Sequence, residues 1–274
     1  MKRILTALVL IPLVLVLVFL GPIWLLTLVT AGVAMLAAWE FLGMAEQYGA
    51  KPPRMAVLAA ILGLFLGVFQ WPDLTAAIVG IFCLALLVYC SFNSPVERVM
   101  ADATSSVFCL LYIGFTLMAL PALREEPNGP SLVCFLLCTV WAGDSVALYV
   151  GKAWGRHKLA PTISPNKSWE GALGSVAGSL LATGVLLGLA ALLAQWESFK
   201  LSFPDDAWYW LGLAVVVNVA AQVGDLAESA LKRSAGVKDS GSLLPGHGGV
   251  LDRVDALLLA APVLWYAQLI HQRF

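Results

Sequence analysis

The sequence predicts an all-α protein, a polytopic integral membrane helical bundle of about nine transmembrane helices with a cytoplasmic N-terminus. Its 274 residues are 60% hydrophobic and 12% charged, whereas soluble domains average about 45–50% apolar and about 25% charged residues. Long charge-free runs and a one-sided distribution of Lys and Arg support the same fold class. This composition excludes an ordinary soluble enzyme and a disordered chain. The net charge of −1 gives no basic field for binding nucleic acid.

The charge-free runs define the expected spans, because a helix needs about 20 apolar residues to cross the hydrocarbon core. The first run, residues 4–39, is too long for one helix. Gly21-Pro22 divides it into spans near 4–20 and 22–38, since proline cannot continue the preceding helix and glycine permits a tight turn. The remaining spans are expected at residues 55–72, 74–96, 103–123, 127–150, 171–196, 207–224 and 256–270. The last is short, which leaves eight spans as the alternative count.

Lys and Arg set the orientation, because they are retained on the cytoplasmic side. With the N-terminus inside, all of these residues fall inside except Arg124, Lys200 and Arg273. Residues 1–100 then form an N-terminal region with spans one to four. Residues 101–274 form a catalytic region with spans five to nine and cytoplasmic loops at 151–170 and 228–255. The apolar stretch after Lys2-Arg3 is longer than a signal peptide core, and we expect an uncleaved first helix.

The second loop holds a polar pattern suited to phosphate chemistry. Asp225, Ser229 and Lys232 or Arg233 are spaced to share one face of a helix. A stretch rich in glycine follows, and its backbone can approach a ligand closely. Asp252 and Asp255 then open the last span. Carboxylates beside cations and glycines suit a complex of Mg²⁺ with a polyphosphate, because Mg²⁺ is bound by one or two carboxylates plus substrate phosphates.

Acidic residues within or beside spans are expensive to bury, and the default interpretation is functional. Asp144, Asp225, Asp252 and Asp255 are therefore the principal candidates. Asp144 has a structural alternative, a bridge to a nearby cation. The basic residues of the first loop have an alternative too, because topology alone predicts cations there and these often touch lipid headgroups.

The run Ser229-x-Leu-Lys-Arg-x4-Lys-Asp-x-Gly-x2-Leu-Pro-x-His-Gly-Gly-Val-x-Asp-Arg-Val-Asp255 resembles the signature of the phosphatidate cytidylyltransferase family, also called CDP-diacylglycerol synthases. The upstream segments Trp141-x2-Asp144-Ser, Tyr149-x-Gly, His157-Lys-Leu-x-Pro161 and Ser164-Pro-x-Lys-Ser-Trp-Glu-Gly171 are similar to the same family. One departure is Asn166, where many members carry a second lysine. The motifs span about residues 135–260.

The resemblance implies a nucleotidyltransferase of phospholipid synthesis in the bacterial inner membrane, with its active site facing the cytoplasm. Such an enzyme joins CTP and phosphatidic acid to give CDP-diacylglycerol and pyrophosphate. It requires Mg²⁺, and the family suggests a second cation and a homodimer. The lipid phosphate is itself the nucleophile, so no protein nucleophile is needed.

The resemblance also implies roles for individual residues. Asp225 and Asp252 would hold Mg²⁺, and Asp144 and Asp255 would support the polar site. The negative charge of the triphosphate and of the leaving pyrophosphate would be neutralised by Lys232, Arg233, Lys238 and Arg253. The nucleotide or metal would be positioned by Ser229, Asp239 and His247, with the backbone of Gly248 and Gly249. The lipid phosphate or triphosphate would be bound by Lys167, Ser164 and Ser168.

Two other functions remain open on the sequence. A CTP-dependent polyprenol or phytol kinase would transfer the γ-phosphate to an alcohol and release CDP. An ion-coupled transporter would also carry intramembrane acids, but its polar residues would not cluster at one face, and inverted repeats usually bring paired broken helices. A non-catalytic scaffold is disfavoured by the combination of acids, cations and glycines.

Overall fold

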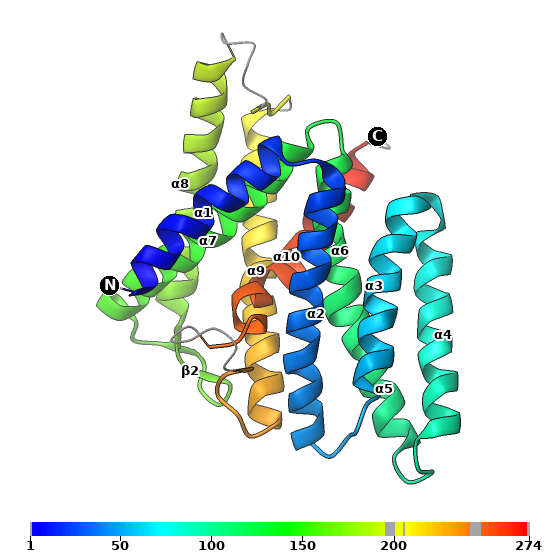
Figure 1. Cartoon of the computed structure of the whole chain (residues 1–274). Helices are drawn as coiled ribbons and strands as arrows, with labels where there is room; N and C mark the ends of the chain where they lie inside the picture. The colour runs from blue at the N-terminus through cyan, green and yellow to red at the C-terminus, as the bar shows by residue number, and fades with distance from the viewer. Residues whose placement is uncertain (1, 195–200, 205, 242–247, 273–274) are drawn as a thin grey trace. The chain divides into compact units, whose positions relative to one another are not determined.

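The computed structural model describes residues 2–194, 201–204, 206–241 and 248–272 (Figure 1). The chain divides into two compact units. The first comprises Pro22–Ala119 and Leu231–Val254 with the first few residues of the chain, and the second comprises Leu5–Gly21, Leu120–Ala230 and Asp255–Phe274. Four of the boundaries fall inside helices, in α1 (Lys2–Leu20), α6 (Thr116–Glu125), α9 (Ala207–Ser234) and α10 (Leu251–His271).

The first unit is built from successive helices that pack as neighbours in chain order. They are α2 (Ile23–Gln47), α3 (Arg54–Gln70), α4 (Thr75–Asn93) and α5 (Val99–Cys109), with a short 3₁₀ turn at Pro72–Leu74 and a π-helix at Leu110–Phe115 that leads into α6 (Thr116–Glu125). Fully buried apolar side chains fill the space between them, among them Leu42, Ile61 and Ile113. The C-terminal turn of α9 and the first turn of α10 belong to this unit.

The second unit centres on the long contact between α7 (Gly129–Trp154) and α8 (Trp169–Leu193), which lie side by side (Figure 1). It also contains most of α1 (Lys2–Leu20), most of α9 and the body of α10. Its aromatic core is formed by Phe135, Phe203 and Trp210. The ring centroid of Trp210 lies 5.3 Å from that of Phe135 and 4.9 Å from that of Phe203. This geometry is the edge-to-face contact that aromatic pairs favour.

The predicted break at Gly21-Pro22 is confirmed. α1 ends at Leu20, and α2 begins at Ile23 with Pro22 as its N-cap residue. A side chain at position 21 would overlap the carbonyl oxygen of Leu17, so the backbone passes closer to the preceding turn than a larger residue permits.

The described part of the chain contains seven helices that are long and apolar enough to cross a membrane. The chain is therefore an all-α integral membrane protein. Two further apolar stretches, residues Leu10–Leu20 of α1 and the helix α3 (Arg54–Gln70), coincide with the predicted first and third spans. The count of nine spans and the cytoplasmic N-terminus both stay predictions.

The predicted loops at 151–170 and 228–255 are shorter than expected. The first four residues of one loop continue α7, while α9 extends to Ser234 and α10 already begins at Leu251. A charged residue ends an apolar run but does not end a helix, because the backbone hydrogen bonds of the helix can continue beyond the membrane into the aqueous region. The first loop also contains a two-stranded antiparallel sheet of β1 (Lys158–Ala160) and β2 (Ser164–Ser168), a small departure from the all-α expectation.

A buried polar network joins α7, α8 and α9 within the second unit. The Asn218 amide donates to the hydroxyls of Ser175 at 2.9 Å and Ser179 at 2.7 Å, and Ser179 donates to the carbonyl of Thr139 at 2.8 Å. Gly143 lies against this network: a Cβ there would come within 2.8 Å of Ser179 Oγ. Small residues and interhelical hydrogen bonds are what hold helices together where water is absent.

We predict that Gly143→Ala destabilises the protein although alanine is the better helix former. The added methyl overpacks the network, which costs roughly 1–3 kcal/mol, and the melting temperature in detergent should fall by several degrees. The matched control is Gly212→Ala on α9, because a Cβ there meets nothing within 4 Å. Fluorescence-detected gel filtration after heating measures both variants. Equal melting temperatures would contradict the role given to Gly143.

Candidate active site

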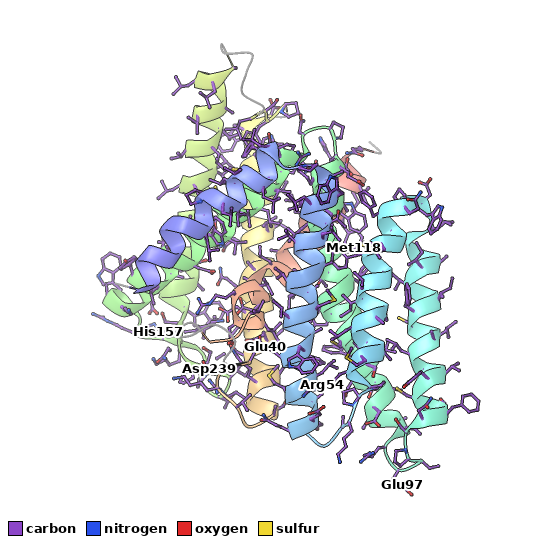
Figure 2. The ribbon with its side chains drawn as sticks, viewed as in Figure 1. Glu40, Arg54, Glu97, Met118, His157 and Asp239 are labelled. Atoms are coloured by element: carbon purple, nitrogen blue, oxygen red, sulfur yellow. The ribbon has the colours of Figure 1, made fainter. Side chains whose placement is uncertain are left out.

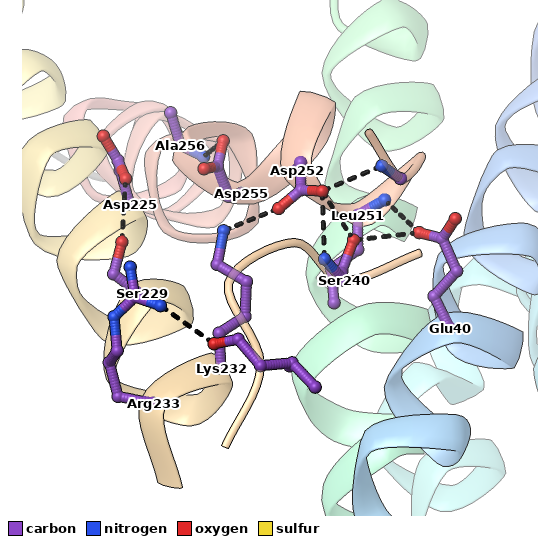
Figure 3. A network of polar contacts seen from close by, with 12 residues as sticks. Glu40, Asp225, Ser229, Lys232, Arg233, Ser240, Leu251, Asp252, Asp255 and Ala256 are labelled. Carbon is purple, nitrogen blue, oxygen red and sulfur yellow. Dashed lines mark hydrogen bonds and ion pairs between the residues drawn. The ribbon is translucent and has the colours of Figure 1, made fainter. Parts of the chain in front are cut away.

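Asp252 lies at the centre of a polar network in the first unit (Figure 3). Lys232 Nζ is 2.6 Å from one of its carboxylate oxygens, Oδ1. The other oxygen, Oδ2, accepts from the Gly249 amide at 2.8 Å, the Ser240 amide at 3.1 Å and the Ser240 hydroxyl at 3.0 Å. A carboxylate in the first turn of a helix is favoured because backbone N–H groups there lack intrahelical partners. One side chain thus ties the end of α9 to the start of α10.

The Lys232–Asp252 pair is well shielded, since the two side chains are 11% and 12% exposed. Ionic attraction strengthens as water is excluded, but removing either partner leaves a charge without compensation. Sequence reasoning gave these residues separate roles as charge-neutralising cation and metal ligand. The structure brings them into direct contact.

The backbone conformation at position 248 requires glycine. Its φ of +77° lies in the left-handed region, which only glycine enters at no steric cost. A Cβ at this position would also come within 2.9 Å of Asp252 Oδ2. Its neighbour Gly249 supplies the amide that Asp252 accepts. These two predicted ligand-binding glycines therefore shape the network around Asp252.

Glu40 on α2 belongs to the same network and was missed by the sequence reasoning. Its Oε2 accepts from the Leu251 amide at 2.8 Å and from the Ser240 hydroxyl at 3.1 Å. The predicted second span ends at residue 38, short of Glu40. Because α2 continues to Gln47, Glu40 is inside a long helix and only 5% exposed. The sequence signal that could have identified Glu40 is its position directly after a charge-free run.

The other predicted residues of the first unit lie at its surface. Arg233 is exposed and donates to the Val237 carbonyl at 2.9 Å. Three further charged residues are exposed, Lys238, Asp239 and Arg253; Figure 2 shows Asp239 on the segment that follows α9. His247 lies outside the described residues. The exposed cations are accessible to a soluble ligand.

The second unit gathers a separate group of charges. Lys167 Nζ on β2 lies 2.7 Å from Asp225 Oδ2 on α9 and also interacts with Asp144 on α7. Asp255 on α10 interacts with Asp225, Asp144 and Glu228 through their negative charges. Four carboxylates thus lie in one group, and Lys167 interacts with two of them, Asp225 and Asp144. Such an excess of negative charge within one group favours a cation beside it.

Glu228 and Asp144 differ in burial within this group. Glu228 is fully buried on α9 and was not among the predicted residues, although it stands one turn after Asp225. Asp144 is on the exposed side of α7 and interacts with Lys167, which agrees with the structural-bridge alternative as well as with a role in the site. Ser229 donates to Asp225 Oδ1 at 3.5 Å (Figure 3).

The β1–β2 hairpin fixes the position of Lys167. Its ends are held by Glu170, whose carboxylate accepts from the amides of Arg156 and His157 and contacts the His157 ring at 2.6 Å. Ser168, predicted to bind phosphate, is buried and caps α8 by accepting from the Gly171 amide at 3.1 Å. Ser164 begins the strand and is half-buried.

Among the described residues, no group of three or more His, Cys, Asp or Glu is arranged to hold a metal ion. The donors present are carboxylate oxygens, which are the ligands that Mg²⁺ prefers. Mg²⁺ commonly takes one or two carboxylates and completes its shell with water and substrate phosphates. The donor chemistry therefore fits Mg²⁺ that arrives with a nucleotide.

Comparison with known proteins places the chain among lipid-modifying enzymes. A sequence model of the cytidylyltransferase family matches residues 1–271. A phosphatidate cytidylyltransferase of Pseudomonas aeruginosa is 37% identical over 97% of both chains, and one of Haemophilus influenzae is 31% identical over 97% of both. A phosphatidate cytidylyltransferase of Brucella melitensis is 46% identical over 57% of this chain. That alignment spans 54% of the relative, about half of its length.

We predict strong energetic coupling between Lys232 and Asp252. A double-mutant cycle with Lys232→Gln and Asp252→Asn, read as unfolding free energy in a denaturing-detergent titration, should give a coupling above about 1 kcal/mol. The control is the more exposed pair Arg54–Glu46, whose charged atoms are 2.7 Å apart. Its coupling energy should be about 1 kcal/mol or less, as is usual for exposed ion pairs. A coupling near zero for Lys232 and Asp252 would show that the shielded pair does not tie the two helices.

Proposed function

Because the chain belongs to the cytidylyltransferase family, we propose that it is a phosphatidate cytidylyltransferase. It transfers CMP from CTP to phosphatidic acid and forms CDP-diacylglycerol and pyrophosphate in phospholipid synthesis. The observation that carries this proposal is the shielded Lys232–Asp252 pair, which lies within the segment that resembles the family signature. We place the enzyme in the bacterial inner membrane with its active site facing the cytoplasm, where CTP is available and the lipid substrate stays in the bilayer.

In the proposed reaction an oxygen of the phosphatidate phosphate attacks the α-phosphorus of CTP in line. A new P–O bond forms while the bond from the α-phosphorus to the oxygen that bridges to the β-phosphate breaks. Pyrophosphate leaves with that electron pair. The protein contributes position and charge rather than covalent chemistry, as is usual in transfer at phosphorus.

The cations of the signature segment hold the charge of the triphosphate and of the leaving pyrophosphate. They are Lys232, Arg233, Lys238 and Arg253. Positive groups fixed where negative charge develops lower the barrier. The exposed positions of Arg233, Lys238 and Arg253 are consistent with reaching a nucleotide that arrives from water.

Asp225 and Asp252 are the proposed carboxylate ligands of Mg²⁺, on the basis of the sequence pattern and the donor chemistry. When bound, Mg²⁺ supplies charge neutralisation on the phosphates. Lys167, with Ser164, is the proposed partner of the lipid phosphate, and Asp144 and Asp255 support that polar group. Ser229, Asp239 and His247 are proposed to orient the nucleotide.

The test is the product formed by purified protein from CTP, phosphatidate and Mg²⁺. We expect CDP-diacylglycerol and pyrophosphate, identified by mass. Release of CDP together with a phosphorylated alcohol would instead favour a lipid kinase, and ion flux into liposomes without CTP would favour a transporter.

The same assay tests whether the signature cations carry the reaction. Arg253→Gln removes an exposed charge, so the fold should persist while kcat/KM for CTP falls about 10-fold or more, because charge-assisted hydrogen bonds to phosphate are lost. Lys51→Gln is the matched control, an exposed cation outside the signature segment, and should behave as wild type. Equal losses in the two variants would contradict a specific role for Arg253.

A further inference from the structure

We propose that Glu40 is a positioning residue for the transfer reaction. It holds Ser240 and Leu251 in place and thereby fixes Asp252 and Lys232. This inference rests on the proposed function. It adds a residue from the second helix of the chain to a site that the motifs confine to the last part of the sequence.

The location of Glu40 is costly, which points to a specific use. Its side chain is 5% exposed and lies on α2, a helix long and apolar enough to span a membrane. Burying a carboxylate is unfavourable unless hydrogen-bond donors replace the lost water. Figure 2 shows Glu40 on the side of α2 that faces the segment carrying Asp239.

Two donors compensate one oxygen of the buried carboxylate, Oε2, although they are distant from Glu40 in sequence. The Leu251 amide donates to Oε2 at 2.8 Å, and the Ser240 hydroxyl donates to the same oxygen at 3.1 Å. Leu251 is the first residue of α10, and its N–H has no partner inside that helix. Glu40 therefore caps α10 from another helix.

The glycines of the segment fit the shape of this contact. A Cβ at Gly241 would overlap Glu40 Oε1, and a Cβ at Gly249 would overlap Glu40 Oε2. Both residues are glycine because the backbone lies directly against the carboxylate. The part of the segment that the structure describes is thus built around Glu40 at both ends.

The contact reaches the proposed reaction centre through Ser240. The Ser240 hydroxyl lies 3.1 Å from Glu40 Oε2 and 3.0 Å from Asp252 Oδ2, and the Ser240 amide donates to the same Asp252 oxygen. Asp252 in turn contacts Lys232 (Figure 3). Displacing Ser240 and Leu251 would therefore displace Asp252. Partners that orient a ligating carboxylate typically affect activity by about 10–100-fold when lost.

The inference predicts different results for two substitutions. Glu40→Gln keeps a carbonyl oxygen that can accept from Leu251 and Ser240, so kcat should stay within a few-fold of wild type. Glu40→Ala removes the acceptor, so kcat should fall about 10–100-fold while KM for phosphatidate changes little. A fall in kcat with KM unchanged indicates that the lost interaction is made only in the transition state.

Hydrogen exchange gives a readout that does not depend on activity. In the purified protein, Glu40→Ala should increase exchange in peptides covering residues 248–254, whereas Glu46→Ala should not. Glu46 lies on the same helix, is more exposed and pairs with Arg54. Both variants are compared after gel filtration, so that only folded protein is measured, and Glu40→Gln covers the case in which the alanine variant does not fold.

The outcomes separate the inference from the proposed function. Unchanged exchange in Glu40→Ala overturns the structural role, and increased exchange with wild-type kcat overturns the positioning role. A loss in Glu40→Gln equal to that in Glu40→Ala would show that the charge itself is needed, which also overturns positioning by hydrogen bonds. A wild-type protein that forms no CDP-diacylglycerol overturns the proposed function, while the exchange measurement still tests the contact.

Discussion

The carboxylate of Asp252 is the interaction on which the polar part of this protein depends. One oxygen contacts Lys232, and the other accepts from Ser240 and Gly249. In a chain with only 12% charged residues, these groups are held where water is scarce. Where water is scarce, a donor or an acceptor left without its partner is costly, so each group in the network needs the other. This mutual requirement holds the end of α9, Ser240 and the start of α10 together.

The positions of most helices could be predicted from the sequence, because crossing a membrane imposes one physical requirement, a long apolar run. Gly21-Pro22 was readable for a local reason, since both residues restrict the backbone there. The helix ends were not predictable in the same way. α9 continues past its charge-free run to Ser234 because helical hydrogen bonding does not depend on apolar side chains.

The candidate site was predictable in part. Asp144 and Asp255 stand out because acids in apolar surroundings are rare, and each takes part in a polar group. Glu40 obeys the same rule but was missed, because its significance depends on contacts about two hundred residues away in sequence. Ser168 shows the opposite case: a residue in a motif that also has a local structural task, capping α8. Pairing between distant segments is what a single sequence does not reveal.

Each polar group, taken by itself, suits the proposed reaction, in which the substrates bring the negative charge. The first unit holds the exposed cations of the signature segment and a carboxylate fixed by backbone donors, and the second holds a lysine paired with Asp225. The proposed transfer needs such charged groups and no protein nucleophile. The distinctive claim is that the lipid phosphate itself attacks CTP. This claim distinguishes direct transfer from any route through a covalently labelled protein.

Isotope tracing tests that claim most directly. Phosphatidate carrying ¹⁸O in its phosphate is incubated with CTP labelled at the α-phosphorus. Direct attack predicts that the lipid product contains the labelled phosphorus and that an ¹⁸O atom from phosphatidate bridges the two phosphates. Appearance of ¹⁸O in pyrophosphate, or of the phosphorus label on the protein, would contradict the account.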